Sequence, residues 1–159
     1  YYSYSKRAIL EFKFQKNVYL GIQLSKLMAR SLKNVSWISS IDYIVPIPLH
    51  RIRERERGFN QAEIIAQTLG KELNIEVVND NLKRIKNNKP QHTSSSTERY
   101  ENVKNIFEMK DKNMFNNKNI LLVDDIITTC STIKSCCQVI KENNNTMIYI
   151  ACLASDRCS

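Results

Sequence analysis

The sequence lacks the features that mark a membrane-spanning, secreted or zinc-binding protein. No apolar run approaches the roughly 20 residues needed to cross a bilayer, and no secretory signal is visible. The cysteines number five, which is odd, and no two of them form a C-x-x-C pair. We therefore expect neither a disulfide framework nor a closed zinc site, and we expect a reducing, cytoplasmic setting.

Histidine is also scarce, and the chain does not begin with methionine. His50 and His92 are the only histidines, and neither has a metal-binding partner at a usual spacing. The first residue is Tyr1, so we expect the chain to be part of a longer protein. Its 159 residues fit one domain, 1–159, with a core large enough to fold without cross-links.

The charge is strongly positive. The formal net charge is +8, with an isoelectric point near 9.3. Such a surplus favours polyanionic partners such as phosphates, pyrophosphate or nucleic acid. Abundant solvated lysine would give the same surplus, so the net charge alone leaves both interpretations open.

Apolar periodicity outlines the first half of the chain. It predicts helices over Ser5–Phe14 and Tyr19–Leu32, and another from Ala62 to Leu73. A short strand at Ile44-Val45 should end at the prolines that follow it, because proline cannot continue a central strand. The charged segment His50–Gly58 is interpreted as a loop.

The second half contains the clearest structural unit. Asn119–Val123 is a continuous apolar run, typical of a strand buried on both faces of a parallel sheet. A polar turn, Asp124–Thr132, follows it. A helix over Ile133–Lys141 and a strand over Met147–Leu153 complete a βαβ unit. The sequence thus predicts an α/β domain with a Rossmann-like central parallel sheet and helices on both faces.

The polar turn is the best candidate site. Ligands of parallel α/β sheets bind outside the carboxyl ends of the strands, and free N–H groups at a helix N-terminus suit a phosphate. Two acids, Asp124 and Asp125, precede the turn and could accept hydrogen bonds from sugar hydroxyls. The hydroxyl-bearing residues of the turn are Thr128, Thr129, Ser131 and Thr132. The simpler alternative is that one of these residues only caps the helix.

Three segments, in the same order along the chain, resemble one known family. Leu121–Thr129 resembles the phosphoribosyl pyrophosphate (PRPP) binding signature of type I phosphoribosyltransferases. Val45–His50 and Arg55–Ala62 are similar to the ComF group, the competence-associated phosphoribosyltransferase-like proteins. The third match consists of Pro90, Gln91, Arg99, Asn102, Val103 and Phe107.

The resemblance implies a role for each segment. Asp124 and Asp125 would be the catalytic acids that contact the ribose hydroxyls, and the following loop would hold the 5′-phosphate. The phosphate-binding residues would be Thr128, Thr129, Cys130, Ser131 and Thr132. The pyrophosphate loop would contain His50, Arg51, Arg57 and Gly58, although pairing of its arginines with Glu54 and Glu56 would equally describe a solvated helix face. The polar, apolar-poor segment Lys86–Asn102, with Arg99 and Asn102, would be a mobile hood, and Mg²⁺ would be held through the ligand rather than directly by the protein.

This chain departs from the family pattern at two places. Cys130 stands where the family usually has glycine, which would strain the turn if the backbone there needs a positive φ. Its thiol, near a helix N-terminus, would also ionise more easily and repel a phosphate. In addition, the N-terminal four-cysteine zinc module common in the family is absent from this chain.

Three functions remain open at this point. The first is a ComF-like protein that binds PRPP or a related phosphoribosyl ligand and transfers the pentosyl group from PRPP, and that the resemblance links to DNA uptake in natural transformation. The second is a non-catalytic competence factor that binds single-stranded DNA or nucleotides and contacts other competence proteins. The third is a phosphoribosyltransferase of nucleobase salvage.

Overall fold

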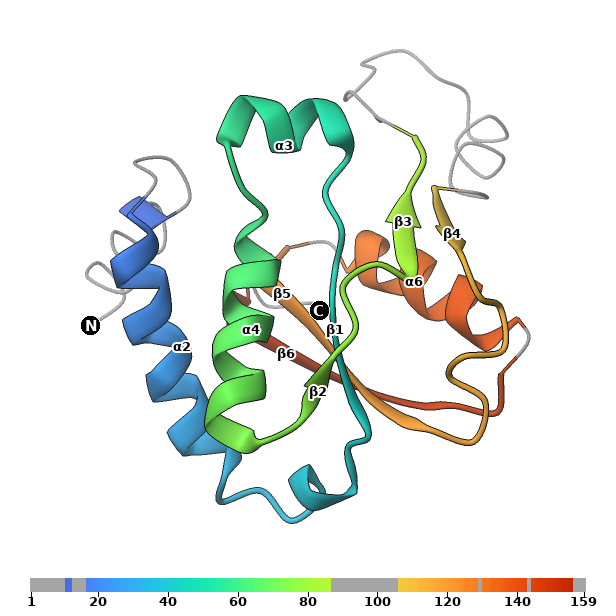
Figure 1. The fold of residues 1–159 in the computed structure, drawn as a ribbon, viewed down its shortest axis with the longest axis horizontal. Helices are drawn as coiled ribbons and strands as arrows, with labels where there is room; N and C mark the ends of the chain where they lie inside the picture. The colour runs from blue at the N-terminus through green and yellow to red at the C-terminus, as the bar shows by residue number, and fades with distance from the viewer. Residues whose placement is uncertain (1–10, 13–16, 87–105, 129, 143, 156–159) are drawn as a thin grey trace.

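A four-stranded parallel sheet forms the centre of the molecule (Figure 1). The computed structural model describes residues 11–12, 17–86, 106–128, 130–142 and 144–155. The strands lie in the order β2-β1-β5-β6. Their bounds are β1 (Tyr43–Pro46), β2 (Glu76–Val77), β5 (Asn119–Ile127) and β6 (Met147–Ser155). The expected α/β class with a central parallel sheet is therefore confirmed.

Helices cover both faces of this sheet. On one side lie α2 (Val18–Leu32) and α4 (Gln61–Leu73), and on the other lies α6 (Ser131–Lys141) (Figure 1). Successive strand residues point to opposite faces, so a sheet covered on both sides needs an unbroken apolar strand. The strand β5 meets this need: Leu121 and Val123 join the core under α2 and α4, while Ile120 and Leu122 join the core under α6.

A small antiparallel sheet lies beside α6. It pairs β3 (Leu82–Arg84) with β4 (Phe107–Met109), and its buried side chains belong to the same core as those of α6. The predicted hood, residues 86–102 with Arg99 and Asn102, lies outside the described residues except for Lys86. The first predicted helix also lies outside them, apart from Glu11 and Phe12, which are helical. None of the helices within the described ranges is long and apolar enough to cross a membrane.

The acidic turn begins later than the sequence predicts. Pairing with β6 continues to the end of β5, with Asp124 opposite Cys152 and Ile127 opposite Ser155. Asp124 and Asp125 are therefore strand residues rather than turn residues, and only residues 128–130 separate the strand from α6. The prediction of a turn over residues 124–132 was wrong because β6 extends its partner beyond the apolar run.

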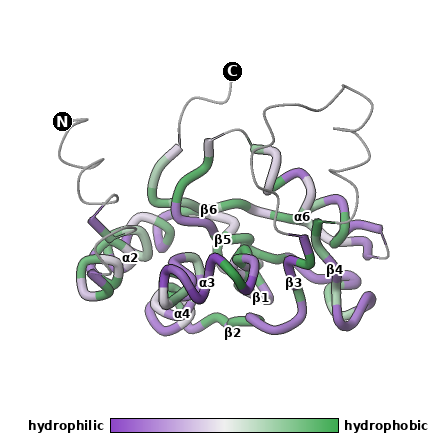
Figure 2. The backbone as a smooth tube through the Cα atoms, turned by 90° about the horizontal axis from the view of Figure 1, so that it is seen from above, coloured by the Kyte–Doolittle hydropathy of each residue, from purple (hydrophilic) through white to green (hydrophobic). Residues whose placement is uncertain are grey.

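The charged segment after β1 is a helix, not a loop. The helix α3 (Arg51–Arg57) begins at His50, whose Nδ1 accepts a hydrogen bond of 3.3 Å from the backbone N–H of Ile52. It ends at Gly58, whose φ of 86° reverses the chain direction. Arginine and glutamate are good helix formers, so this short and mostly exposed helix needs no apolar face to form. Figure 2 shows this helix as hydrophilic beside the hydrophobic central strands.

Candidate functional site

The carboxyl ends of β1 and β5 lie together at one edge of the sheet. The strands are in parallel register, with Pro46 opposite Val123, and the N–H of Ile47 extends the pairing by donating to the carbonyl of Val123 at 2.9 Å. The first strand leads into α3 and the second into the turn before α6. This edge is where an α/β sheet of this kind binds its ligands, so it is the place to look for a site.

The two acids lie at the end of β5, with their carboxylates fixed by the backbone. Oδ1 of half-buried Asp124 accepts from the N–H of Asp125 at 2.8 Å, and Oδ1 of buried Asp125 accepts from the N–H of Ile126 at the same distance. Strand alternation puts Asp124 on the same face of β5 as Ile120 and Leu122, which is the face that α6 covers.

The turn between β5 and α6 ends with a residue in the left-handed backbone conformation. Cys130 is the N-cap residue, with φ 55° and ψ −4°, and its side chain makes no capping hydrogen bond. The side chain of Cys130 thus does not cap the first N–H groups of α6. Thr128 and Ser131 are exposed and Thr132 is half-buried, whereas Thr129 lies outside the described residues.

The cysteines differ in part from the expected pattern. Cys136, Cys137 and Cys152 are free, and burial raises the pKa of all three thiols. Cys130, in contrast, is disulfide-bonded. The expectation of a free Cys130 thiol that ionises beside a phosphate was therefore wrong for this structure, because a disulfide sulfur has no proton to lose. The positive φ on which the expected strain depends is present at Cys130.

The arginines of α3 fall into two groups. Arg53 and Arg57, one turn apart, are half-buried, whereas Arg51 and Arg55 are exposed. Arg57 Nη1 donates to Gln61 Oε1 at 3.2 Å, which ties α3 to the start of α4. The predicted arginines Arg51 and Arg57 thus differ in exposure, and Arg53, which the sequence did not favour, lies within electrostatic reach of the small sheet.

The structure adds one residue that sequence reasoning missed, Arg84 of β3. Its side chain is about half-buried. Burial is the main cause that lowers the pKa of Arg84, and the positive charge of Arg53 lowers it further. The negative charge of Asp124 acts in the opposite direction. The charges of Arg53 on α3 and Asp124 on β5 thus both act on Arg84. In the sequence it lies between Lys83 and Lys86 and looks like one more solvated cation.

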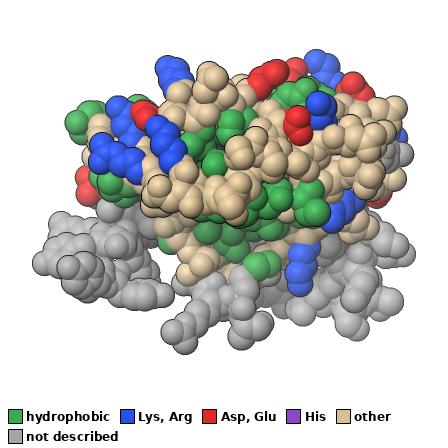
Figure 3. All heavy atoms as spheres, turned by 90° about the horizontal axis from the view of Figure 1, so that it is seen from below, with side chains coloured by type: hydrophobic (Ala, Val, Ile, Leu, Met, Phe, Trp, Pro, Cys, Tyr) green, Lys and Arg blue, Asp and Glu red, His purple; other side chains and the backbone are tan. Residues whose placement is uncertain are grey.

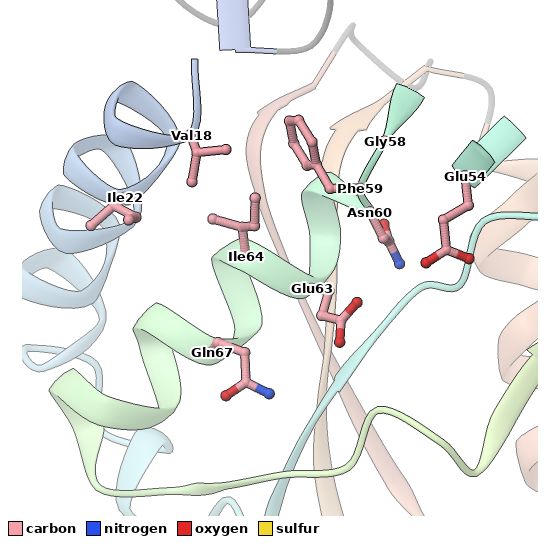
Figure 4. Close-up of a pocket in the computed structure, with 9 residues that line it drawn as sticks. All are labelled: Val18, Ile22, Glu54, Gly58, Phe59, Asn60, Glu63, Ile64 and Gln67. Atoms are coloured by element: carbon pink, nitrogen blue, oxygen red, sulfur yellow. The ribbon is translucent and has the colours of Figure 1, made fainter. Parts of the chain in front are cut away.

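A separate pocket of about 460 Å³ lies between α2 and the beginning of α4 (Figure 4). Its apolar wall comes from both helices, and its acidic side chains are Glu54 and Glu63. Neither Asp124 nor the α6 turn lines it. Apolar surface with two carboxylates suits a phosphate poorly, so this pocket is not the counterpart of the predicted phosphate site.

Comparison with known sequences agrees with this geometry. The family profile described as phosphoribosyl transferase domain matches residues 54–159, which include α4, both acids and α6. The chain belongs to the phosphoribosyl transferase domain family. The sequence-based assignment to this family, in its ComF-type form, is confirmed.

Individual curated relatives and solved structures are similar to this chain in sequence or in fold. Competence protein F of Haemophilus influenzae is 33% identical over 138 residues, covering 84% of this chain and 60% of that protein. DNA utilization protein YhgH of Escherichia coli K12 is 27% identical over 148 residues, covering 91% and 64%. The chain thus spans less than two thirds of their length. The purine phosphoribosyltransferase of Pyrococcus horikoshii Ot3 shares the fold, with a TM-score of 0.54 and 17% identity over 89% of this chain and 77% of that chain.

Proposed function

We propose that this domain binds PRPP or a closely related phosphoribosyl ligand at the joint edge of β1 and β5. The observation that carries the proposal is the combination of a fixed, half-buried Asp124 with a helix N-terminus that its own N-cap side chain does not cap. An acid accepts hydrogen bonds from ribose hydroxyls, and a helix N-terminus attracts a phosphate. The two lie only a few residues apart along β5 and its turn.

Each part of the site has a separate role in this proposal. Asp124 and Asp125 orient the ribose, and the backbone of the turn with Thr128, Ser131 and Thr132 holds the 5′-phosphate. Cations from α3 face the pyrophosphate. Thr129, Arg99 and Asn102 keep the roles that the family resemblance implies.

The reaction that suits this site is pentosyl transfer from PRPP. The bond between the anomeric carbon and the pyrophosphate oxygen breaks, and pyrophosphate leaves with the electron pair. A nitrogen of the acceptor bonds to that carbon and loses its proton. The cationic sugar formed on the way needs fixed negative charge and exclusion of water more than a protein nucleophile.

The residues of the site fit a Mg²⁺ ion that is held mainly by oxygens of the bound PRPP. No group of three or more metal-binding side chains occurs within the described residues. A hard cation prefers carboxylate and phosphate oxygens, and half-buried Asp124 could contribute one such oxygen. Mg²⁺ bound to PRPP would neutralise charge on the leaving pyrophosphate, while Asp124 and the α6 turn orient the sugar phosphate.

Calorimetric titration tests the proposal directly. The domain is titrated with PRPP, ribose 5-phosphate and free nucleobases, each with and without Mg²⁺. We expect PRPP and ribose 5-phosphate to bind, with PRPP strengthened by Mg²⁺. Absence of binding for both phosphoribosyl compounds under all conditions would refute the proposal.

A role in handling incoming DNA is a second proposal, for which the names of the relatives are the specific support. Competence protein F and DNA utilization protein YhgH are so named, and this chain carries a net charge of +8. On the face shown in Figure 3, however, basic and acidic side chains are interspersed around apolar surface, so no uniform basic patch is visible there. Single-stranded DNA would therefore meet another face or another part of the protein.

Salt dependence separates this role from PRPP binding. Binding through several DNA phosphates releases counterions and should weaken on the order of tenfold or more between low and physiological salt. PRPP binding should instead respond mainly to Mg²⁺ and to loss of the acids. We place both roles in the cytoplasm, where incoming single-stranded DNA would arrive.

A further inference from the structure

Cys130 is disulfide-bonded, whereas the other described cysteines are free thiols, namely Cys136, Cys137 and Cys152. The sequence contains five cysteines, and the fifth is Cys158, which lies outside the described residues. Within this chain, Cys158 is therefore the one cysteine left to pair with Cys130.

The two strands that lead to these cysteines end side by side. β5 and β6 are parallel neighbours, and their pairing continues as far as Ile127 opposite Ser155. Cys130 is the third residue after Ile127, and Cys158 is the third residue after Ser155. Paired strands lie about 5 Å apart, three residues reach at most about 10 Å, and a disulfide needs Cα atoms within roughly 7 Å of each other. The strand register thus allows a bond between Cys130 and Cys158 without any change in the described strands.

Redox chemistry in the described part of the chain should centre on Cys130. Burial raises the pKa of the thiols of Cys136, Cys137 and Cys152, so these three stay protonated and react slowly. A reduced Cys130, in contrast, directly precedes α6, and a helix N-terminus stabilises a thiolate. Disulfides of cytoplasmic proteins are usually transient, with catalytic or sensing roles. A disulfide at this reactive position therefore fits a reversible bond.

The bond lies at the phosphate end of the proposed ligand site. Cys130 is the N-cap residue of α6, in the left-handed conformation with a φ of 55°. A phosphate at this end needs the first N–H groups of α6 and the space in front of them. A disulfide would fix a second stretch of backbone, that of Cys158, within roughly 7 Å of Cys130. The bonded chain and a 5′-phosphate would then compete for the same space.

We infer that Cys130 and Cys158 form a reversible disulfide that blocks the 5′-phosphate site when oxidised and frees it when reduced. This inference rests on the proposed function and adds control by redox state. A dithiol reductant supplies the two electrons: one of its thiolates attacks a sulfur of the bond to form a mixed disulfide, and the other then displaces the cysteine. Both cysteines end as thiols with the two protons of the dithiol, which leaves as its own disulfide. A small-molecule disulfide drives the reverse reaction.

The test compares the oxidised and reduced forms of the full chain. One sample is treated with oxidised glutathione and another with dithiothreitol, and each is separated from the reagent under nitrogen before titration calorimetry with ribose 5-phosphate. Cys158→Ser removes the partner without altering the turn. Cys137→Ser is the matched control, because Cys137 is a free, half-buried cysteine on α6. Peptide mapping by mass spectrometry identifies the bonded cysteines, and thermal unfolding checks that each variant is folded.

We expect the oxidised chain to bind ribose 5-phosphate on the order of tenfold more weakly than the reduced chain, with a mapped bond between Cys130 and Cys158. Cys158→Ser should bind like reduced wild type under both conditions, and Cys137→Ser should repeat the wild-type difference. Equal affinity of the two wild-type forms, a different mapped bond, or the same redox difference in Cys158→Ser would overturn the inference while leaving the proposed function intact. A reduced chain that binds neither ribose 5-phosphate nor PRPP with Mg²⁺ would refute the proposed function and the redox block with it.

Discussion

The side chain of Asn60 bonds to the backbone carbonyl of Ile47, thirteen residues earlier, at 3.1 Å. This bond closes the segment that carries α3 and anchors it to the end of β1. Asn60 also caps α4, because its Oδ1 accepts from the N–H of Ala62 at 3.1 Å. The ComF-like segment around Asn60 therefore has a structural task, which is to hold α3 and its arginines over the site.

Replacing Asn60 should cost more than the loss of a helix cap. Asn60→Ala removes both bonds in a buried position, and we expect a loss of about 2 kcal/mol in the free energy of unfolding. Asn17→Ala is the comparison: Asn17 caps α2 by accepting from Leu20 at 3.1 Å and donates to Glu11 Oε1 at 3.1 Å in a less buried position, and we expect its loss to cost about 1 kcal/mol. Chemical denaturation measures both, and equal losses would show that the buried bond to Ile47 contributes no more than the bond to Glu11.

Asp42 should make stability depend on pH. Its Oδ2 accepts from the backbone N–H of Asn119 at 2.8 Å, and its Oδ1 lies 3.3 Å from Lys118 Nζ. The bond to Asn119, supported by Lys118, lowers the pKa of Asp42. A carboxylate with a lowered pKa stabilises the fold above its unfolded pKa, near 4, and this contribution is lost as the pH falls through the folded pKa.

The corresponding variant is Asp42→Ala. We expect it to be less stable than wild type by roughly 0.5 kcal/mol at pH 7, because water screens the interactions of this exposed carboxylate, with the difference narrowing below about pH 4. Denaturant unfolding at several pH values checks this. A difference that grows toward low pH would contradict the assigned direction of the pKa shift.

Cys130 should strain the turn in front of α6. Its φ of 55° is in the left-handed region, where a Cβ atom is unfavourable by about 1 kcal/mol and glycine is not. We expect Cys130→Gly to be more stable than Cys130→Ala by about that amount and to bind ribose 5-phosphate more tightly. Both variants lack the disulfide, so their comparison isolates the backbone effect. If the two variants are equally stable and bind equally well, the strain is negligible.

The two acids should differ in their effect on binding. Asp124→Asn and Asp125→Asn are expected to weaken PRPP on the order of tenfold or more, because the ribose hydroxyls lose charged acceptors. Since Asp125 is buried, its variant should also lower the melting temperature, whereas half-buried Asp124 should change binding more than stability. Asp80→Asn, at an exposed pair with Lys110, serves as the control. Wild-type affinity in both acid variants would exclude them from the ribose site.

The sequence alone determined the features that depend on neighbouring residues. The apolar run from Asn119 could only be a strand buried on both faces, and the acids and hydroxyls after it placed the candidate site at the carboxyl end of that strand. Helix periodicity gave α4 and α2 nearly to the residue. Local spacing is sufficient for such features because strand alternation and helix repeat are properties of short segments.

Contacts between distant segments decided the rest. Pairing with β6 made Asp124 and Asp125 strand residues, and the path of the turn set the positive φ of Cys130. Arg84 lies forty residues before Asp124, and only the pairing of β3 with β4 and their packing beside α6 bring it to the site. Sequence spacing carries no information about which distant charges meet, because the sheet and its covering helices fix those distances together.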